Sequence, residues 1–272
     1  QSRLKTMLEY KNLELGGCYH QAPMSYPALL SWCEKKAEQF APYITDTGNY
    51  IAAALSNHQK VVLEAQLGAM RDIDYGIFPY TSSSSTISAY GPICAGIPGT
   101  LPDHIIGVLK AYSTCVGAGP FTAEKAMPEK WMESLRKSGG EYGAATGRPR
   151  RVGPFDAVAS AYGLKCQNAD KIALTKLDVL SHMDEIPVIT SYKLNDEIIT
   201  EFDPLDDLDS MTPVIQMLPG WNTDISKCRK YEELPENARK YIETLEHLLN
   251  HEIQFISVGA ERNQYLTKGE WL

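Results

Sequence analysis

Long apolar runs, paired cysteines and a Walker-type phosphate loop are all missing from this sequence. Every apolar stretch falls short of the roughly 18–20 residues that a membrane-spanning helix needs. The first residues, Gln1 to Lys5, are polar and do not lead into the apolar segment of a secretory signal. We therefore expect a protein without a membrane partner.

The cysteines and histidines are few and scattered. There are six of each, and no C-x-x-C pair occurs. The sequence therefore predicts no metal site and no disulfide framework. Isolated cysteines suit a reducing cytoplasm, where most are expected to be small buried side chains. No Ser/His/Asp group stands out either, so no catalytic residue is assigned in this chain.

Charge and composition exclude further classes. The formal net charge is -8, with 26 basic and 34 acidic residues, which argues against a nucleic-acid partner. The chain is 43% hydrophobic and 22% charged over 272 residues, as in ordinary globular proteins. This length is enough for one large α/β domain or two small ones.

The apolar pattern changes after about 58 residues. Before that point helical spacing dominates, in 3–10, 26–40 and 51–55. Because 3–10 reads as the middle of a helix and no initiator Met precedes it, we expect a fragment of a longer protein. We expect a helical segment over 1–58 and an α/β portion over 59–272.

The second portion alternates short apolar runs with helices. Helix 236–250 has an apolar stripe on one face, and Pro235 suits its first turn. Several of the runs are apolar on both faces, as in buried parallel strands. The expected fold is therefore α/β, a mostly parallel central sheet flanked by helices. The expected strands are Lys60–Ala65, His104–Ala111, Ile172–Leu177, Pro187–Lys193, Pro213–Met217 and Ile253–Val258.

One of these strands ends in a possible guanine-reading motif, T-K-L-D, at Thr175–Asp178. A carboxylate at a strand end can accept hydrogen bonds from guanine N1–H and the exocyclic amine, a donor pair that adenine lacks. The stem of Lys176 can cover the face of the base. A second strand ends at Ser257-Val258-Gly259, where a small turn would let backbone groups approach a base edge. The alternative is two ordinary strand ends with a surface lysine and a helix-capping aspartate.

Residues 143–151, G-A-A-T-G-R-P-R-R, combine two glycines with three arginines. Arginine forks bind carboxylates and phosphates, and three neighbouring cations repel one another unless an anion lies between them. The alternative is a solvated basic loop. A hydroxyl-rich segment, Thr81–Thr86, reads from composition as a flexible loop.

Taken in order, these segments resemble adenylosuccinate synthetases along essentially the whole chain. The stretches that carry the resemblance are D-I-D-Y-G at 72–76, P-Y-T-S-S at 79–83, L-K-A-Y-S-T at 109–114, V-G-A-G-P-F at 116–121, Y-G-A at 142–144, T-G-R at 146–148, R-R at 150–151, A-L-T-K-L-D-V-L at 173–180, P-G-W at 219–221, and I-S with Gly259 and Arg262 from residue 256. Several motifs in one order are far more specific than any single one.

The resemblance implies a P-loop-NTPase-like fold and a ligase of purine synthesis. Such enzymes use GTP to phosphorylate the 6-oxygen of IMP, and the amine of L-aspartate then displaces the phosphate. It also implies a homodimer and Mg²⁺. This sequence does not contain the family's Gly-Asp-Glu-Gly-Lys-Gly-Lys segment, which carries the catalytic base and a Mg²⁺ ligand. It also lacks the histidine that follows this segment and acts as the catalytic acid. The 272-residue chain alone is therefore expected to be inactive.

The resemblance implies that 59–272 is the nucleotide- and aspartate-binding portion, one continuous domain of a larger enzyme. It also assigns three groups of binding residues by their motifs. The GTP group is Arg150, Lys176, Leu177, Asp178, Ser257, Val258 and Gly259. The aspartate group is Ala144, Ala145, Thr146, Gly147, Arg148, Pro149 and Arg150. The IMP group is Arg148, Ser82, Val116 and either Leu67 or Gln66.

The IMP group departs most from the family pattern. Leu67 stands where the family has an IMP-contacting Gln, and its side chain cannot hydrogen-bond; a local slip would let Gln66 substitute. Ser82 replaces a Thr and keeps the hydroxyl, whereas Cys115 replaces an Arg. Ala145 and Pro149 replace a Thr and an Arg. A synthetase with a different purine monophosphate, and a non-catalytic nucleotide-binding or dimerisation module, remain as alternatives.

Overall fold

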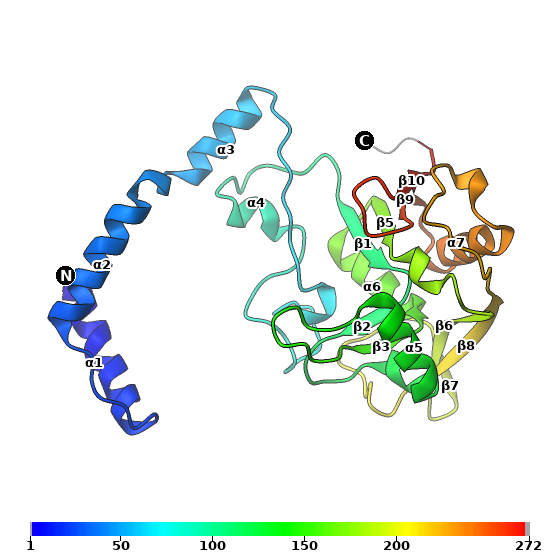
Figure 1. The fold of residues 1–272 in the computed structure, drawn as a ribbon, viewed down its shortest axis with the longest axis horizontal. Helices are drawn as coiled ribbons and strands as arrows, with labels where there is room; N and C mark the ends of the chain where they lie inside the picture. The colour runs from blue at the N-terminus through cyan, green and yellow to red at the C-terminus, as the bar shows by residue number, and fades with distance from the viewer. Residues whose placement is uncertain (1, 270–272) are drawn as a thin grey trace. The chain divides into compact units, whose positions relative to one another are not determined.

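The computed structural model describes residues 2–269, which divide into two units, Gln1–Val61 and Val62–Leu272. Unit 1 is helical and consists of α1 (Ser2–Gly17), α2 (Tyr26–Phe40), a short 3-10 turn and α3 (Thr47–Ser56), all blue in Figure 1. The helices predicted in this part of the sequence are confirmed. Ser25 caps α2 and Asp46 caps α3, each accepting a hydrogen bond from a backbone amide in the first turn.

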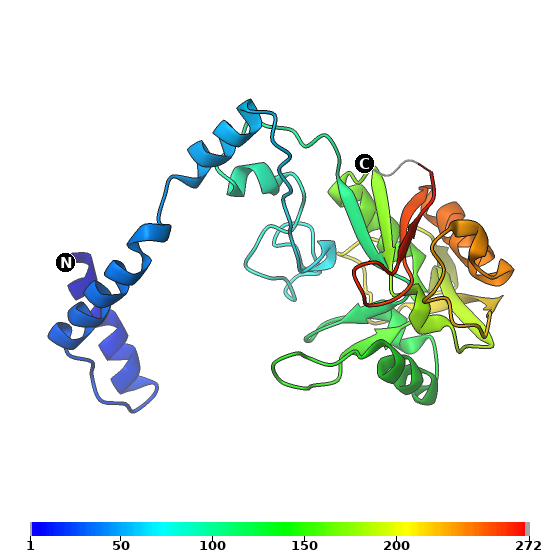
Figure 2. The same cartoon turned by 45° about the horizontal axis from the view of Figure 1, so that its top comes forward.

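Unit 2 is of the α/β class, as predicted. Its first sheet has the strand order β1-β5-β9-β10, made of β1 (Ile106–Lys110), β5 (Lys171–Thr175), β9 (Ile253–Ser257) and β10 (Tyr265–Thr267). β1, β5 and β9 are parallel, and β10 runs antiparallel to β9. Figure 2 shows the three parallel strands side by side. Their carboxyl ends therefore meet at one edge of the sheet.

A second sheet is built around β6 (Glu185–Leu194). It pairs in parallel with β4 (Phe155–Asp156) and antiparallel with both β7 (Glu197–Ile199) and β8 (Thr212–Pro219). The apolar runs at 187–193 and 213–217 are thus confirmed as strands, and their mutual pairing is antiparallel. A two-stranded ribbon, β2 (Ser113–Cys115) with β3 (Arg151–Gly153), carries loops on both sides of the site described below.

Helices α4 (Tyr90–Cys94), α5 (Glu129–Gly139), α6 (Ala157–Gln167) and α7 (Glu236–Leu249) complete the unit. The apolar stripe predicted for α7 is buried, and Pro235 lies at its N-cap, one position before the first turn. α6 contacts β1 in the first sheet and β6 in the second, so it joins the two sheets. The main core forms between these layers, with Ile172, Leu174 and Ile256 fully buried.

Two sequence-based expectations about local structure are wrong. Lys60–Ala65 forms no strand, because the segment is exposed and pairs with no other strand in the described part of the chain; Val62 is 88% exposed. The six cysteines are free, but none is buried: Cys18 and Cys94 are exposed and the other four are half-buried. An apolar run forms a strand only where a neighbouring strand can accept its hydrogen bonds.

Candidate functional site

The predicted guanine-reading residues meet at the carboxyl edge of the first sheet. Leu109 of β1 lies beside Leu174 of β5, and Leu174 lies beside Ile256 of β9. The residues that follow these strands, Lys176 and Val258 among them, therefore lie at neighbouring strand ends. This edge is where ligands bind in open α/β sheets.

Lys176 and Asp178 follow β5 at a sharp change of backbone direction. Lys176 has a φ of 61°, in the left-handed region that non-glycine residues seldom occupy. Its Nζ donates a 2.6 Å hydrogen bond to the carbonyl of Gly139. Burial raises the pKa of the half-buried Asp178 carboxyl, while its own backbone amide and the charge of Lys176 oppose this.

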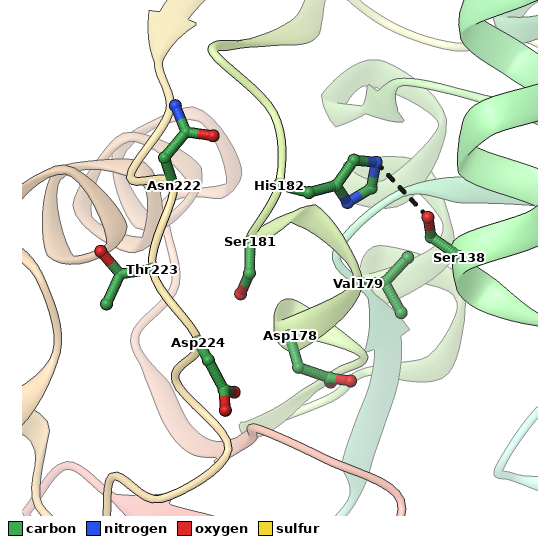
Figure 3. A pocket seen from close by; sticks show the side chains of 8 residues that line it. All are labelled: Ser138, Asp178, Val179, Ser181, His182, Asn222, Thr223 and Asp224. Carbon is green, nitrogen blue, oxygen red and sulfur yellow. Dashed lines mark hydrogen bonds between the residues drawn. The ribbon is translucent and has the colours of Figure 1, made fainter.

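Asp178 opens onto a polar surface hollow of about 510 Å³. Asp178 and Asp224 both line this hollow (Figure 3). Sequence analysis did not single out Asp224, which lies shortly after the P-G-W motif. Its charge adds to the rise in the pKa of Asp178. The hollow is lined by Ser138, Asp178, Val179, Ser181, His182, Asn222, Thr223 and Asp224.

Some predicted GTP-binding residues can offer only their backbone. The side chains of Leu177 and Val258 are fully buried in the core. The expected turn after β9 is present, with the Ser257 hydroxyl donating to the carbonyl of Gly259 over 3.0 Å. The amide of Val258 donates to the carbonyl of Gln264, which holds this turn against the chain that returns to β10.

The arginine loop is a tight, exposed turn. The amide of Gly143 donates to the carbonyl of Arg148, the amide of Gly147 donates to that of Gly143, and Gly147 has a φ of 64°. Residues 144–149, which include Ala144, Ala145, Thr146 and Pro149, are all exposed. Within residues 2–269 the side chain of Arg148 makes no hydrogen bond or ion pair, so its guanidinium is open to a ligand.

The three arginines of the loop do not need an external anion to offset their mutual repulsion, because two of them pair with carboxylates of the protein. Arg151 makes a two-armed ion pair with Glu124 and donates to the carbonyls of Gly117 and Gly119. Arg150 points the other way and donates from Nη1 to Glu141 over 2.8 Å. The argument from repulsion therefore applies to none of them, and among the described residues only the guanidinium of Arg148 lacks an internal partner.

Glu141 is the residue that sequence reasoning missed and that joins the two predicted sites. Its fully buried carboxylate accepts hydrogen bonds from Lys110, Tyr112 and Arg150, and the Nζ of Lys176 lies 3.3 Å away. Burial favours the protonated acid, but the hydrogen bonds from Lys110 and Tyr112 and the nearby positive charges lower its pKa to about 2. The nearest signal in the sequence was its place directly before the Y-G-A motif.

The IMP group is partly brought together, by a residue that was not predicted. The backbone carbonyl of Arg71 accepts from the amide of Ser82, and its guanidinium donates to the carbonyls of Tyr80, Val116 and Ala118. Arg71 Nη2 also lies 2.9 Å from the sulfur of Cys115. Arg71 therefore holds Ser82 and the loop of Val116 together. Its guanidinium lies beside Cys115, the position where the family has an arginine.

The other IMP candidates, Gln66 and Leu67, lie in an exposed stretch. Leu67 has a φ of 79° and is 55% exposed, and neither side chain makes a hydrogen bond in the described part of the protein. By contrast, the hydroxyl-rich segment 81–86 is not a free loop. The amide and hydroxyl of Thr86 donate to the buried Asp72 carboxylate, which also accepts from the amides of Asp74 and Tyr75.

Among residues 2–269, no group of three His, Cys, Asp or Glu side chains could hold a metal ion. No helix in the same range is long and apolar enough to cross a membrane.

Comparison with known proteins gives a consistent result. The family model for adenylosuccinate synthetase matches residues 1–266. The chain is 40% identical over 263 residues to the adenylosuccinate synthetase of Carboxydothermus hydrogenoformans, and 37% identical over 265 residues to that of Caldanaerobacter subterraneus. These alignments cover 96% and 97% of this chain but 61% of each relative.

A solved structure agrees with the sequence matches. The fully ligated adenylosuccinate synthetase from Plasmodium falciparum superimposes with a TM-score of 0.88 at 32% identity. The match covers 98% of this chain and 64% of that one. The chain thus spans less than two thirds of the length of these relatives.

Proposed function

Because this chain belongs to the adenylosuccinate synthetase family, we propose that it supplies guanine and aspartate recognition to a GTP-dependent ligase. The ligase joins L-aspartate to IMP and gives adenylosuccinate, in the synthesis of AMP. The observation that carries the proposal is the meeting of Lys176, Asp178 and Ser257–Gly259 at one sheet edge, next to the arginine loop. Family membership and this geometry support the same assignment.

Guanine selection rests on Asp178. When ionised, its carboxylate accepts hydrogen bonds from guanine N1–H and the exocyclic amine, and an adenine would leave it unpaired in a half-buried position. Lys176 covers the base with its stem while its ammonium is held at Gly139. Leu177 and Val258 contribute through their backbone, and Arg150 contributes positive charge on the phosphate side.

Aspartate recognition rests on the loop from Ala144 to Arg150. Arg148 offers a carboxylate an exposed guanidinium that has no partner in the described part of the structure, while Ala145, Gly147 and Pro149 shape the backbone around it. Arg148 also reaches the IMP side, where the phosphorylated oxygen leaves with negative charge. A guanidinium in this position stabilises both the incoming carboxylate and the leaving phosphate.

The purine monophosphate side supports a second candidate function, a synthetase with altered substrate specificity. Ser82 and Val116 are held together by Arg71. Leu67 offers no hydrogen-bonding side chain, and the side chain of Gln66 has no partner within residues 2–269. Comparing turnover of IMP with that of other purine monophosphates in the full-length protein separates the two. A third candidate, a non-catalytic nucleotide-binding or dimerisation module, predicts binding without turnover.

The remaining parts of the proposal follow from the family alone. We expect a cytoplasmic homodimer that uses Mg²⁺, and a catalytic base and acid supplied by a segment that this sequence does not contain. The described residues provide no metal cluster, so no step is assigned to Mg²⁺ within this chain. Purified 272-residue chain is expected to form no adenylosuccinate from IMP, GTP and aspartate, and product formation would contradict this.

Calorimetry on the purified chain tests the guanine assignment. GTP and GDP should bind and ATP should bind at least tenfold more weakly, since the wrong base leaves Asp178 unpaired. Asp178→Asn should abolish this preference, because an amide cannot accept both guanine donors. Lys193→Met, which removes an exposed lysine paired with Asp196, serves as the control and should change nothing. Equal binding of GDP and ATP by the wild-type chain would overturn the assignment.

A further inference from the structure

The carboxylate of Glu141 lies at the point where the guanine-binding edge meets the arginine loop. Glu141 follows α5 directly after Gly140, whose left-handed backbone turns the chain inward. The side chain is fully buried, and its two oxygens receive Lys110 at 2.9 Å, Tyr112 at 2.7 Å and Arg150 at 2.8 Å. Residues from β1, from the turn after it and from the arginine loop thus share one acceptor.

The side chains around Glu141 carry more positive charge than its single carboxylate can balance. Three cations, Lys110, Lys176 and Arg150, converge on the single ionised Glu141. Burial and its two cationic neighbours lower the pKa of Lys110, although the hydrogen bond and charge of Glu141 oppose this. In addition, the buried Nε of Arg150 has no hydrogen-bond partner in the described structure. A surplus of partly exposed positive charge, together with one unpaired buried donor, suits a site that receives an anionic ligand.

Two of the three cations belong to the proposed binding residues. Lys176 holds a strained left-handed backbone, and its ammonium is held between the Gly139 carbonyl and Glu141. Its stem is thereby fixed beside Asp178. Arg150 is held through Nη1, and its amide donates to the Glu141 carbonyl, which closes the base of the loop. One side chain therefore sets the positions of both.

We propose that Glu141 is a positioning residue that couples guanine recognition to the arginine loop. It does not contact the nucleotide. It holds the Lys176 stem and the Arg150 fork in the arrangement that binds the base and the phosphate-side charge, so occupancy of one site stabilises the other. The inference rests on the proposed function, since it assumes that Lys176 and Arg150 face GTP.

Two substitutions separate positioning from simple electrostatics. Glu141→Gln removes one negative charge, so Coulomb attraction alone predicts tighter binding of GDP. Positioning predicts the reverse, at least tenfold weaker binding of GDP and several-fold weaker binding of guanosine, which has no phosphate. Glu141→Asp keeps the charge but shortens the side chain, so it cannot reach Lys176 and Arg150 together, and it should also weaken both ligands. If Glu141→Gln fails to fold, the binding measured for Glu141→Asp tests the proposal.

Calorimetry with GDP and guanosine on the 272-residue chain is the measurement, and thermal melting without ligand verifies folding. Glu246→Gln is the matched control, because Glu246 is a half-buried carboxylate paired with Lys268 away from the site, and it should bind GDP within twofold of wild type. A cycle with Lys176→Met should be non-additive, because Glu141 acts on the base through Lys176.

The outcomes distinguish this inference from the proposed function. If the wild-type chain fails to bind GDP, guanine recognition and the coupling are overturned together. If the wild-type chain binds GDP and folded Glu141→Asp binds it within twofold, or Glu141→Gln binds it more tightly, only the inference is overturned. Weaker binding by both variants, together with non-additivity at Lys176, supports it.

Discussion

At the scale of single residues, two carboxylates close to Lys176 have opposite titration behaviour. Burial raises the pKa of Asp178, which has few compensating partners, whereas hydrogen bonds and cations lower that of Glu141 to about 2 in spite of burial. Asp178 is suited to accept hydrogen bonds from a ligand, whereas Glu141 already accepts hydrogen bonds from three side chains of the protein. Their surroundings therefore assign one to recognition and the other to support.

The lowered pKa of Glu141 predicts acid sensitivity. Its ordinary value is 4.5, so the stabilisation is present above about that pH and is lost as the pH falls toward 2. A shift of this size corresponds to a contribution on the order of 3 kcal/mol. Urea unfolding of wild type and Glu141→Gln at pH 7, 4 and 3 should show a steeper loss in wild type. Equal slopes would contradict the prediction.

At the scale of elements, the loop after β2 depends on two arginines that bind alternate carbonyls. Arg71 donates hydrogen bonds to the carbonyls of Val116 and Ala118, and Arg151 donates to the carbonyls of Gly117 and Gly119. Because the two glycines have φ values of 86° and 106°, the carbonyls point to alternating sides of the loop. The loop that carries Val116 is therefore ordered from outside by side chains, and not by its own hydrogen bonds.

Arg71→Ala should loosen this loop. Loss of the donors to three carbonyls is expected to cost about 1–3 kcal/mol of unfolding free energy and to speed amide exchange at 115–119. Arg148→Ala is the matched stability control, because Arg148 is exposed and unpaired among the described residues, and its effect should stay within about 0.5 kcal/mol. Unchanged exchange in Arg71→Ala would show that the loop is held by other contacts.

Helix α6, which joins the two sheets, begins at a buried cap. Asp156 accepts a 3.0 Å hydrogen bond from the amide of Ala159 and a 2.7 Å bond from the hydroxyl of the buried Tyr192. Asp156→Ala removes the cap and leaves Tyr192 unsatisfied, so about 2–4 kcal/mol should be lost in urea unfolding. Asp46→Ala removes the exposed cap of α3 and should leave the main transition unchanged. A smaller loss for Asp156→Ala than for Asp46→Ala would contradict this account.

At the scale of the whole molecule, the two units differ in how they are stabilised. Unit 2 contains the large core between its sheets and helices. The described residues of unit 1 include one buried apolar side chain, Leu8, while Trp32, Tyr43 and Tyr50 are 60% to 81% exposed. Helices without a buried apolar face are marginal in water. We therefore expect unit 2 to fold alone and unit 1 not to.

Two fragments test this expectation. Residues 62–272 should unfold cooperatively in urea with nearly the midpoint of the whole chain, because their core is intact. Residues 1–61 should show partial helicity by circular dichroism and a gradual, non-cooperative thermal transition. A cooperative transition of fragment 1–61, or failure of fragment 62–272 to fold, would contradict the prediction.

Local pattern was sufficient for much of this protein. The helical spacing of 26–40 and 236–250, the apolar runs of five strands and the order of the motifs could all be read from the chain, because each depends on neighbours in sequence. The strand expected at 60–65 was wrong since strand formation needs a partner that a single segment cannot reveal. The pairing of Arg150 and Arg151 with Glu141 and Glu124 was hidden for the same reason.

The sequence by itself determined the α/β class, the family and the two motifs proposed to bind guanine and aspartate. Only the tertiary structure decided that Glu141 joins these motifs and that Arg71 holds Ser82 and Val116 together. It also decided that, of the loop's arginines, Arg148 alone lacks a partner in the described part of the chain. The physical reason is that the charge balance of a buried site depends on side chains brought together from distant parts of the chain. Spacing along the sequence does not record those contacts.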